Sequence, residues 1–403
     1  MTEEDVKEYV LLKYAHLFAE NPDLSVKEIG DGNLNYVYRV RNENDGKSII
    51  IKHATEQIRM NKAEFSTDRS RIETEVLKFE GQLAPGYVPE VYDYDDVMCC
   101  VLMEDLFDYK NLRYELVAHH IYPTLADDIA TFMADTLIKS TDLVIDPAEK
   151  KGLVVKFINP SLCGLTENAI YTGPYFYNEE RNFDGLINQS FMERELYNDD
   201  KIHLEVAKLL QDFKCKAQSL LHGDLHTGSI FVKEGKTMVL DPEFGYYGPA
   251  GFDVGQVISH LIFAWVNSYY TADKEKDAEY IQWLEDTIVQ TVDLFREKSI
   301  KILEEESIGR LEKAPGFNEW FVDDILEDTA GVTGAELMRR LAGKKGGVRD
   351  LNSIEDPERK SAAQRLCVFI AKEIIFNRTS KYKSGKDYID TIHSVVKERG
   401  DEI

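Results

Sequence analysis

The fold is decided by the stretch His222-Gly223-Asp224-Leu225-His226-Thr227-Gly228-Ser229, which Asp241-Pro242-Glu243 follows seventeen positions after Asp224. We name residues 222–229 the catalytic loop and residues 241–243 the acidic turn. Between them, residues 230–233 and 237–240 have the apolar pattern of two short strands, joined by the turn sequence Glu234-Gly235-Lys236. A hairpin returns its second strand beside the start of its first. We therefore expect Asp224 and Asp241 to face the same cleft.

The residue types in these motifs indicate phosphoryl transfer. That reaction needs a carboxylate at the acceptor hydroxyl and carboxylates that hold magnesium on the phosphates. Asp224 is the candidate base or orienting group, and the oxygen ligands of Asp241 and Glu243 suit Mg²⁺ and not Zn²⁺. The position where kinases carry a metal-binding Asn is here Ser229. We infer that the second metal carboxylate has moved to Glu243.

The two histidines of the catalytic loop suggest a metal site with Asp224, but no Cys or further His stands at ligand spacing. We expect His222 to brace the loop through hydrogen bonds and His226 to lie near the mouth of the cleft.

A second set of motifs lies near the N-terminus. Residues 26–29, 36–40 and 48–52 have strand patterns, and the glycine loop (residues 30–35) joins the first two. Gly30 and Gly32 let the backbone approach a phosphate, and the amides of Asn33 to Asn35 can cradle its oxygens, although a plain hairpin turn has the same composition.

Lys52 ends the third strand, as the phosphate-pairing lysine of kinases does, although a lysine that snorkels from a strand end would look alike. A helix predicted over residues 64–83 offers Glu73 or Glu75 as its partner, and the spacing does not decide between them.

The order of these elements predicts an α+β, bilobal fold of the protein-kinase type. Residues 1–105 form a small lobe with an antiparallel sheet, which includes a helix over 4–20 and a strand over 97–103. Residues 106–403 form a larger, mainly helical lobe that holds the catalytic loop, the acidic turn and the acceptor site.

Composition narrows the class of partner. The net charge of 48 − 73 = −25 argues against nucleic acid and against anionic membrane surfaces. No apolar run approaches the roughly 18 residues of a membrane-spanning helix. The acidic N-terminus lacks a signal-peptide pattern, and five cysteines without a C-x-x-C pair suit reduced thiols. We therefore expect a cytoplasmic protein.

These motifs resemble the 5-methylthioribose kinase family, which is similar to aminoglycoside and choline phosphotransferases. The resemblance rests on four segments: Gly30 to Asn35, Met103 to Leu106, His222 to Ser229, and Asp241 to Phe244 continued by Tyr247-Gly248-Pro249 and Gly251 to Gly255. It implies transfer of the γ-phosphoryl group of ATP to the anomeric 1-hydroxyl of 5-methylthioribose, in methionine salvage. It also implies a homodimer.

The resemblance further assigns roles to single positions. Asn35 and Lys52 would contact the ATP phosphates, the backbone of Glu104, Asp105 and Leu106 would meet adenine, and the acidic turn with Pro242 would bind the Mg²⁺–nucleotide. Asp224 would act on the sugar hydroxyl. Arg339 and Arg340 would clamp the sugar, although neighbours on a helix point about 100° apart, so that at most one is expected to line the cleft. Alone, the pair also suits a cationic last turn of a helix.

Two alternative functions remain at this point. One is a related kinase for another sugar, an amino alcohol or an aminoglycoside, although an adjacent arginine pair would repel a polycationic aminoglycoside. The other is an inactive nucleotide-binding module, which only Ser229 favours. The pocket for the methylthio group is not visible in the sequence.

Overall fold

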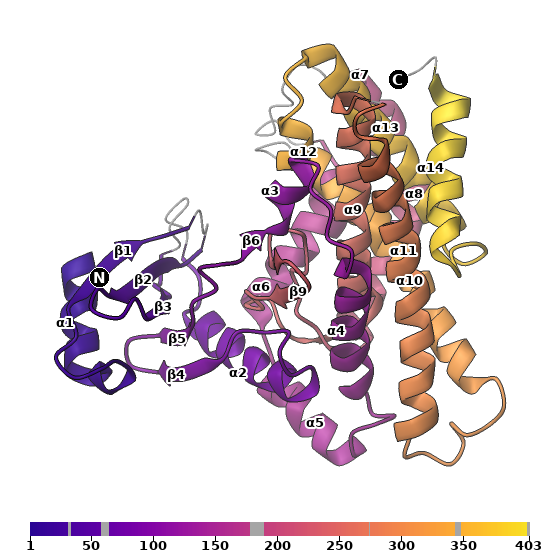
Figure 1. Cartoon of the computed structure of the whole chain (residues 1–403). Coiled ribbons are helices and arrows are strands. Elements are labelled where there is room, and N and C mark those ends of the chain that lie inside the picture. The colour runs from indigo at the N-terminus through magenta and orange to yellow at the C-terminus, as the bar shows by residue number, and fades with distance from the viewer. Residues whose placement is uncertain (31–33, 58–63, 178–188, 274, 343–347, 401–403) are drawn as a thin grey trace.

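The computed structural model describes residues 1–30, 34–57, 64–177, 189–273, 275–342 and 348–400, and it has two lobes (Figure 1). Gly32 and Asn33 of the predicted glycine loop lie outside the described residues. The small lobe is built around one sheet, and the larger lobe consists mostly of long helices that run side by side.

The sheet of the small lobe is antiparallel throughout, with the strand order β1-β2-β3-β5-β4. Its strands and the two helices of this lobe, with a short 3-10 turn η1, are α1 (Glu3–Lys13), η1 (Ala15–Leu17), β1 (Leu24–Glu28), β2 (Tyr36–Asn42), β3 (Ser48–His53), α2 (Asp68–Leu83), β4 (Val91–Asp95) and β5 (Cys100–Glu104).

The alternation of strand residues places Lys52 on the inner face of the sheet. Ile49 and Ile51 are fully buried in a core with Val6 and Val10 of α1. Since successive strand residues point to opposite faces, the next residue, Lys52, points away from α1 and toward the α2 side.

Three predicted elements differ from the structure. The helix expected over 4–20 ends at Lys13 and is followed by η1, and the helix expected from residue 64 begins only at Asp68. The strand expected over 97–103 begins at Cys100, because Asp95 Oδ1 accepts hydrogen bonds from the backbone N–H groups of Val97 and Met98 and holds them in a turn. β4 precedes this turn.

The large lobe follows β5. Its elements are β6 (Lys110–Asn111), α3 (Leu112–Val117), α4 (Leu125–Lys139), α5 (Pro147–Lys156), α6 (Pro160–Thr166), η2 (Glu167–Thr172), η3 (Gly173–Tyr175), α7 (Gln189–Met192), η4 (Glu193–Tyr197), α8 (Asp200–Cys215), β7 (Ser219–Leu220), β8 (Ile230–Lys233), β9 (Lys236–Val239), β10 (Tyr247–Gly248), α9 (Gly251–Thr271), α10 (Ala278–Glu306), α11 (Phe317–Ala342), α12 (Arg349–Asn352), α13 (Pro357–Asn377) and α14 (Gly385–Arg399). We propose the boundary between the lobes at residues 105 and 106, directly after β5, the last strand of the small-lobe sheet in the chain.

The predicted hairpin forms as β8 and β9. Ile230 pairs with Val239, and Leu240 N donates to Ser229 O over 3.0 Å, so the acidic turn follows directly beside the end of the catalytic loop. Behind the hairpin, α9 is buried over nearly its whole length and packs against α11. The chain therefore has the predicted bilobal, kinase-like α+β architecture.

Across the described residues, no helix combines the length and the apolar character that a membrane span requires.

Candidate active site

The catalytic loop is held in place by polar side chains of α9. Asp253 accepts hydrogen bonds from the backbone N–H groups of His222 (2.7 Å) and Gly223 (2.9 Å). One turn further, Gln256 Oε1 accepts from Leu225 N over 2.6 Å. Burial raises the pKa of Asp253 to about 7, although the two backbone donors oppose this shift. A helix that is otherwise apolar thus fixes the backbone on either side of Asp224.

His222 joins the catalytic loop to the acidic turn, which confirms its predicted bracing role. Its Nε2 lies 3.0 Å from Leu240 O, and its Nδ1 accepts from Asp224 N over 3.3 Å. Nε2 therefore carries the proton of a neutral ring. Burial lowers the pKa of His222 to about 4, which is consistent with this neutral form. Gly223 beside it has φ +83°, and a Cβ there would collide with the backbone of Phe244.

Asp224 is partly exposed, with 24% of its side chain accessible, and a neutral histidine faces it. His226 Nδ1 accepts from the backbone N–H groups of Gly228 (3.1 Å) and Ser229 (3.2 Å), so its proton is on Nε2, 3.5 Å from Asp224 Oδ2. Burial, and then the charge of Arg113, hold the pKa of His226 well below its usual range. His226 can thus support the carboxylate of Asp224 without neutralising its charge.

Ser229 does not point a free hydroxyl at a metal. Its Oγ donates to the backbone carbonyl of Asp224 over 3.0 Å, and its side chain is buried. This geometry is compatible with the inference that the metal carboxylate lies instead in the acidic turn.

Both predicted arginines converge on one buried carboxylate of α11. Arg339 Nη1 is 3.0 Å from Glu336 Oε2, and Arg340 Nε is 2.7 Å from Glu336 Oε1. Burial raises the pKa of Asp224, and the charges of Arg339 and then Arg340 oppose that shift. Positions i+3 and i+4 from Glu336 share one helix face, so both long side chains reach the same carboxylate, and the charges of both act on Asp224. That at most one of them lines the cleft stays a prediction.

Lys52 connects the small lobe to the acidic turn. Its Nζ donates to Glu73 Oε1 over 2.9 Å and also contacts Asp241 Oδ1. Glu75 pairs instead with Lys156, at 2.5 Å, which settles the open choice of partner in favour of Glu73. Burial raises the pKa of Glu73 against the opposing charge of Lys52. Asp241 itself has φ +80°, a strained conformation for a residue with a side chain.

Asn35 forms a second connection between the lobes. Its Nδ2 donates to Glu243 Oε2 over 2.6 Å, and its Oδ1 accepts from Arg69 Nε over 2.9 Å. Arg69 is almost fully buried and also donates to the backbone carbonyls of Thr55 and Ser66. The side chain of Asn35 therefore binds the acidic turn. Gly30, the first residue of the glycine loop, has φ +90° and follows β1, which ends at Glu28. Pro242 is buried between the two acidic residues.

The predicted adenine hinge leaves β5 toward the large lobe. Glu104 is the last strand residue, and the Asp105 carboxylate accepts from Arg39 (2.6 and 2.9 Å) and Ser48 Oγ (2.6 Å). Leu106 O accepts from Tyr109 N over 3.0 Å. The side chain of Asp105 thus ties the hinge to Arg39 of β2 and Ser48 of β3.

Not identified from the sequence were the residues that bind and position the predicted site residues, namely Asp253, Gln256, Glu336 and Arg69. A signal was present for the first two. Polar residues at positions 253, 256 and 260 share one face of a segment that is otherwise strongly apolar. Arg69 lies among ordinary charged helix residues and gave no such signal, whereas Glu336 is a single charge in the otherwise uncharged stretch 329–338 and could have been noticed in the same way.

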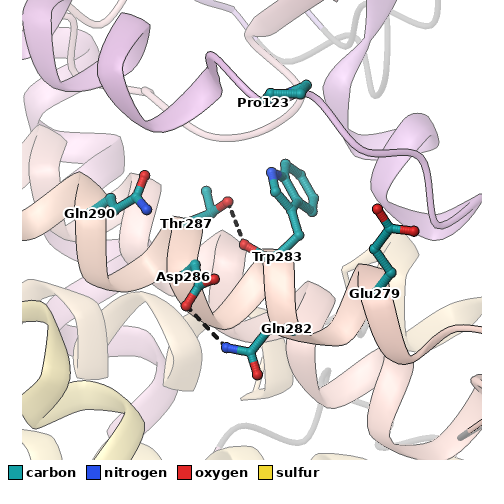
Figure 2. A pocket seen from close by; sticks show the side chains of 7 residues that line it. All are labelled: Pro123, Glu279, Gln282, Trp283, Asp286, Thr287 and Gln290. Carbon is teal, nitrogen blue, oxygen red and sulfur yellow. Dashed lines mark hydrogen bonds between the residues drawn. The ribbon is translucent and has the colours of Figure 1, made fainter.

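A surface pocket of about 350 Å³ lies elsewhere, between α10 and the segment around Pro123 (Figure 2). Three of its polar side chains are engaged within the helix, since Gln282 donates to Asp286 over 3.0 Å and Thr287 donates to Trp283 O over 2.7 Å. None of the predicted site residues lines it.

Comparison with known proteins places this chain in a family. The model of the "Phosphotransferase enzyme family" matches residues 25–286. A methylthioribose kinase of Geobacillus sp. (strain WCH70) is 34% identical over 364 residues, covering 90% of this chain and 88% of the relative. A methylthioribose kinase of Yersinia enterocolitica is 33% identical over 96% of this chain and 97% of its own length. A solved ethanolamine kinase of Plasmodium vivax is 14% identical, covers 91% of this chain and 87% of its own, and has a TM-score of 0.46. The chain therefore belongs to the methylthioribose kinases, within the phosphotransferase enzyme family.

Proposed function

We propose that the protein transfers the γ-phosphoryl group of ATP to the anomeric 1-hydroxyl of 5-methylthioribose, as a step of methionine salvage. The observation that carries the proposal is the Lys52 ammonium, which binds Glu73 and Asp241 together in a chain that matches methylthioribose kinases over most of their length. Lys52, Gly30 and the backbone of residues 104–106 would hold the nucleotide between the lobes.

In this reaction Asp224 orients the acceptor hydroxyl and takes its proton. The bond from O1 to the γ-phosphorus forms while the bond from that phosphorus to the β,γ-bridging oxygen breaks, and ADP leaves. A raised pKa makes Asp224 a better base than a solvent-exposed aspartate. Arg339 and Arg340 would stabilise the charge that develops on the transferring group.

The acidic turn fits a magnesium ion by the chemistry of its donors. Lys52 and Arg69 face Glu73, Asp241 and Glu243, so the protein charges here sum to 2 − 3 = −1. Within the described residues no group of three or more metal-ligating side chains forms, so Asp241 and Glu243 would be the protein's share of the ligands. Mg²⁺ commonly binds in this way, with phosphates and water completing its shell. When bound, it would neutralise phosphate charge during transfer.

Consumption of ATP in the presence of 5-methylthioribose, ribose, choline or kanamycin tests the proposal. We expect turnover with 5-methylthioribose and much weaker turnover with the others. Absence of turnover with 5-methylthioribose would overturn the assignment, and turnover with choline or kanamycin alone would establish the related-kinase alternative.

The homodimer implied by the family resemblance and the cytoplasmic location expected from the composition remain predictions. Light scattering coupled to size-exclusion chromatography checks the first, since a mass near twice 46.2 kDa is expected.

A further inference from the structure

A third guanidinium group lies beside Asp224, on an element that docks against the catalytic loop. Asn111 caps α3, and its Nδ2 donates to Gly228 O over 2.6 Å. In the first turn of α3, Arg113 N donates to Thr227 O over 3.2 Å. These two hydrogen bonds fix the start of α3 on the catalytic loop.

The Arg113 side chain packs against the glycine of the catalytic loop. A Cβ at Gly228 would lie 2.9 Å from Arg113 Cζ and 2.7 Å from His226 Cε1. A side chain at this position would therefore require Arg113 and His226 to move. The guanidinium interacts electrostatically with Asp224 and Asp350, which attract it, and with Arg340, which repels it. Burial, with Arg340 adding to its effect, lowers the pKa of Arg113 to about 10, so it remains a cation at neutral pH.

Several polar atoms of this group are buried and without hydrogen-bond partners. They are Arg113 Nε and Nη2, Arg340 Nη2, and both carboxylate oxygens of Asp350. Asp350 is fully buried, and its position is fixed because its carbonyl accepts from Asn267 Nδ2 (2.6 Å) and Ser353 Oγ (2.7 Å). Arg113 and Asp350 therefore attract one another without bonding through these atoms.

Unpaired donors and acceptors gathered at one place are costly to bury, unless a ligand satisfies both kinds. A hydroxyl group does so, since it accepts from a guanidinium and donates to a carboxylate. We propose that Arg113 and Asp350, with Arg340, form a subsite beside Asp224 that binds the sugar hydroxyls next to the reacting one. This assignment rests on the proposed function: with Asp224 at the 1-hydroxyl, the subsite receives the 2- and 3-hydroxyls.

The subsite makes the enzyme selective for a sugar over an amino alcohol. A choline-like acceptor has a cationic end, which Arg113 and Arg340 repel, and it lacks a neighbouring diol. Glu336 holds Arg339 and Arg340, while unpaired donor nitrogens remain on Arg113 and on Arg340 for the sugar hydroxyls.

The test pairs enzyme variants with altered sugars. We would measure kcat/KM for 5-methylthioribose and its 2-deoxy and 3-deoxy analogues with the wild type, Arg113→Met and Asp350→Asn. At least one deoxy analogue should lose about ten- to hundredfold with the wild type, and that loss should largely disappear with Arg113→Met. The KM for ATP should stay unchanged. Lys110→Met is the control, because it removes a neighbouring cation whose side chain is 62% exposed.

The proposed subsite would be overturned if the loss of activity from deoxygenation of the sugar were independent of the loss from the Arg113 substitution. If deoxygenation and Arg113→Met lower kcat/KM by factors that simply multiply, Arg113 does not contact these hydroxyls, while the proposed kinase function stands. If the wild type fails to phosphorylate 5-methylthioribose at all, the function falls and the subsite with it. Should Arg113→Met not fold by circular dichroism, Arg113→Lys retains the charge, removes the planar fork and must give the same coupling.

Discussion

Asn35 of the small lobe donates a hydrogen bond to Glu243 of the large lobe, from Nδ2 to Oε2 over 2.6 Å, although 208 positions separate them. The same amide accepts from the buried Arg69 of α2. The end of the glycine loop, the helix that carries Glu73 and the acidic turn are thus one hydrogen-bonded unit. A change in any of these parts should therefore affect nucleotide and metal binding together.

Replacing Glu243 should weaken the metal site. Glu243→Gln keeps the shape of the side chain but removes its charge, so we expect the magnesium concentration for half-maximal turnover to rise at least about tenfold. Calorimetric titration of Mg²⁺ with a non-hydrolysable ATP analogue should show the same weakening. Glu234→Gln, in the exposed turn of the hairpin, is the matched control. An unchanged magnesium titration would contradict the relocation of the metal carboxylate to Glu243.

The partner of Lys52 can be tested with two isosteric variants. Glu73→Gln leaves the buried ammonium with a weaker partner, and we expect kcat/KM for ATP to fall by roughly tenfold or more. Glu75→Gln, two positions away, removes only the contact to Lys156 and should leave kinetics near the wild-type values. Equal effects of the two substitutions would show that the Lys52–Glu73 ion pair does not position the nucleotide.

Loss of the Asp224 carboxylate should abolish chemistry without abolishing binding. We expect Asp224→Ala to lower kcat by about 10²- to 10⁴-fold, because the acceptor hydroxyl loses its base or orienting group. Fluorescence titration with a labelled ATP analogue should give a dissociation constant close to that of the wild type. Turnover within about tenfold of the wild type, or 1.4 kcal/mol of barrier, would exclude this role for Asp224.

Buried histidines should make the fold sensitive to acid. Burial lowers the pKa of His222 from 6.5 to about 4. Below pH 6.5 the unfolded chain binds the proton more readily than the folded chain, so stability is lost as the pH falls from about 6.5 to about 4. Lowering the pKa from 6.5 to about 4 corresponds to roughly 3 kcal/mol in the free energy of unfolding.

Urea unfolding across this pH range measures that loss. His222→Gln should flatten the pH dependence, although it lowers stability at neutral pH by removing the bond to Leu240 O. His16→Gln, at an exposed position, should preserve the wild-type slope. A slope that His222→Gln leaves intact would place the acid sensitivity elsewhere in the chain.

The net charge of −25 is compatible with an anionic substrate only because charges are arranged locally. Near the acceptor, three guanidinium groups (Arg113, Arg339 and Arg340) face the carboxylates of Asp224, Glu336 and Asp350. The protein charges there balance. Glu336 binds Arg339 and Arg340, while donors of Arg113 and Arg340 and both carboxylate oxygens of Asp350 remain unpaired. The many other acidic residues leave the outer surface strongly negative.

The sequence by itself determined the parts whose signal is local. Period-two alternation indicated β2 and β3, and the turn Glu234-Gly235-Lys236 indicated the hairpin. Lys52, Asp224 and Asp241 were identified because they have the residue types and the chain order of the phosphoryl-transfer groups in kinases. The predicted limits of α1 and β5 were wrong, and at β5 the cause is a side chain that competes for backbone hydrogen bonds, since Asp95 accepts from Val97 N.

Only the tertiary structure decided which charged residues meet. Glu73 and Glu75 are equivalent in sequence, yet the helix turns one toward Lys52 and the other toward Lys156. In the sequence, Arg69, Arg113 and Asp350 cannot be told apart from charged surface residues. The reason is that the burial of a charge depends on packing between segments far apart in the chain. The sequence thus indicated the residue types that the proposed reaction needs, and the packing of distant segments determined which other residues hold them in place.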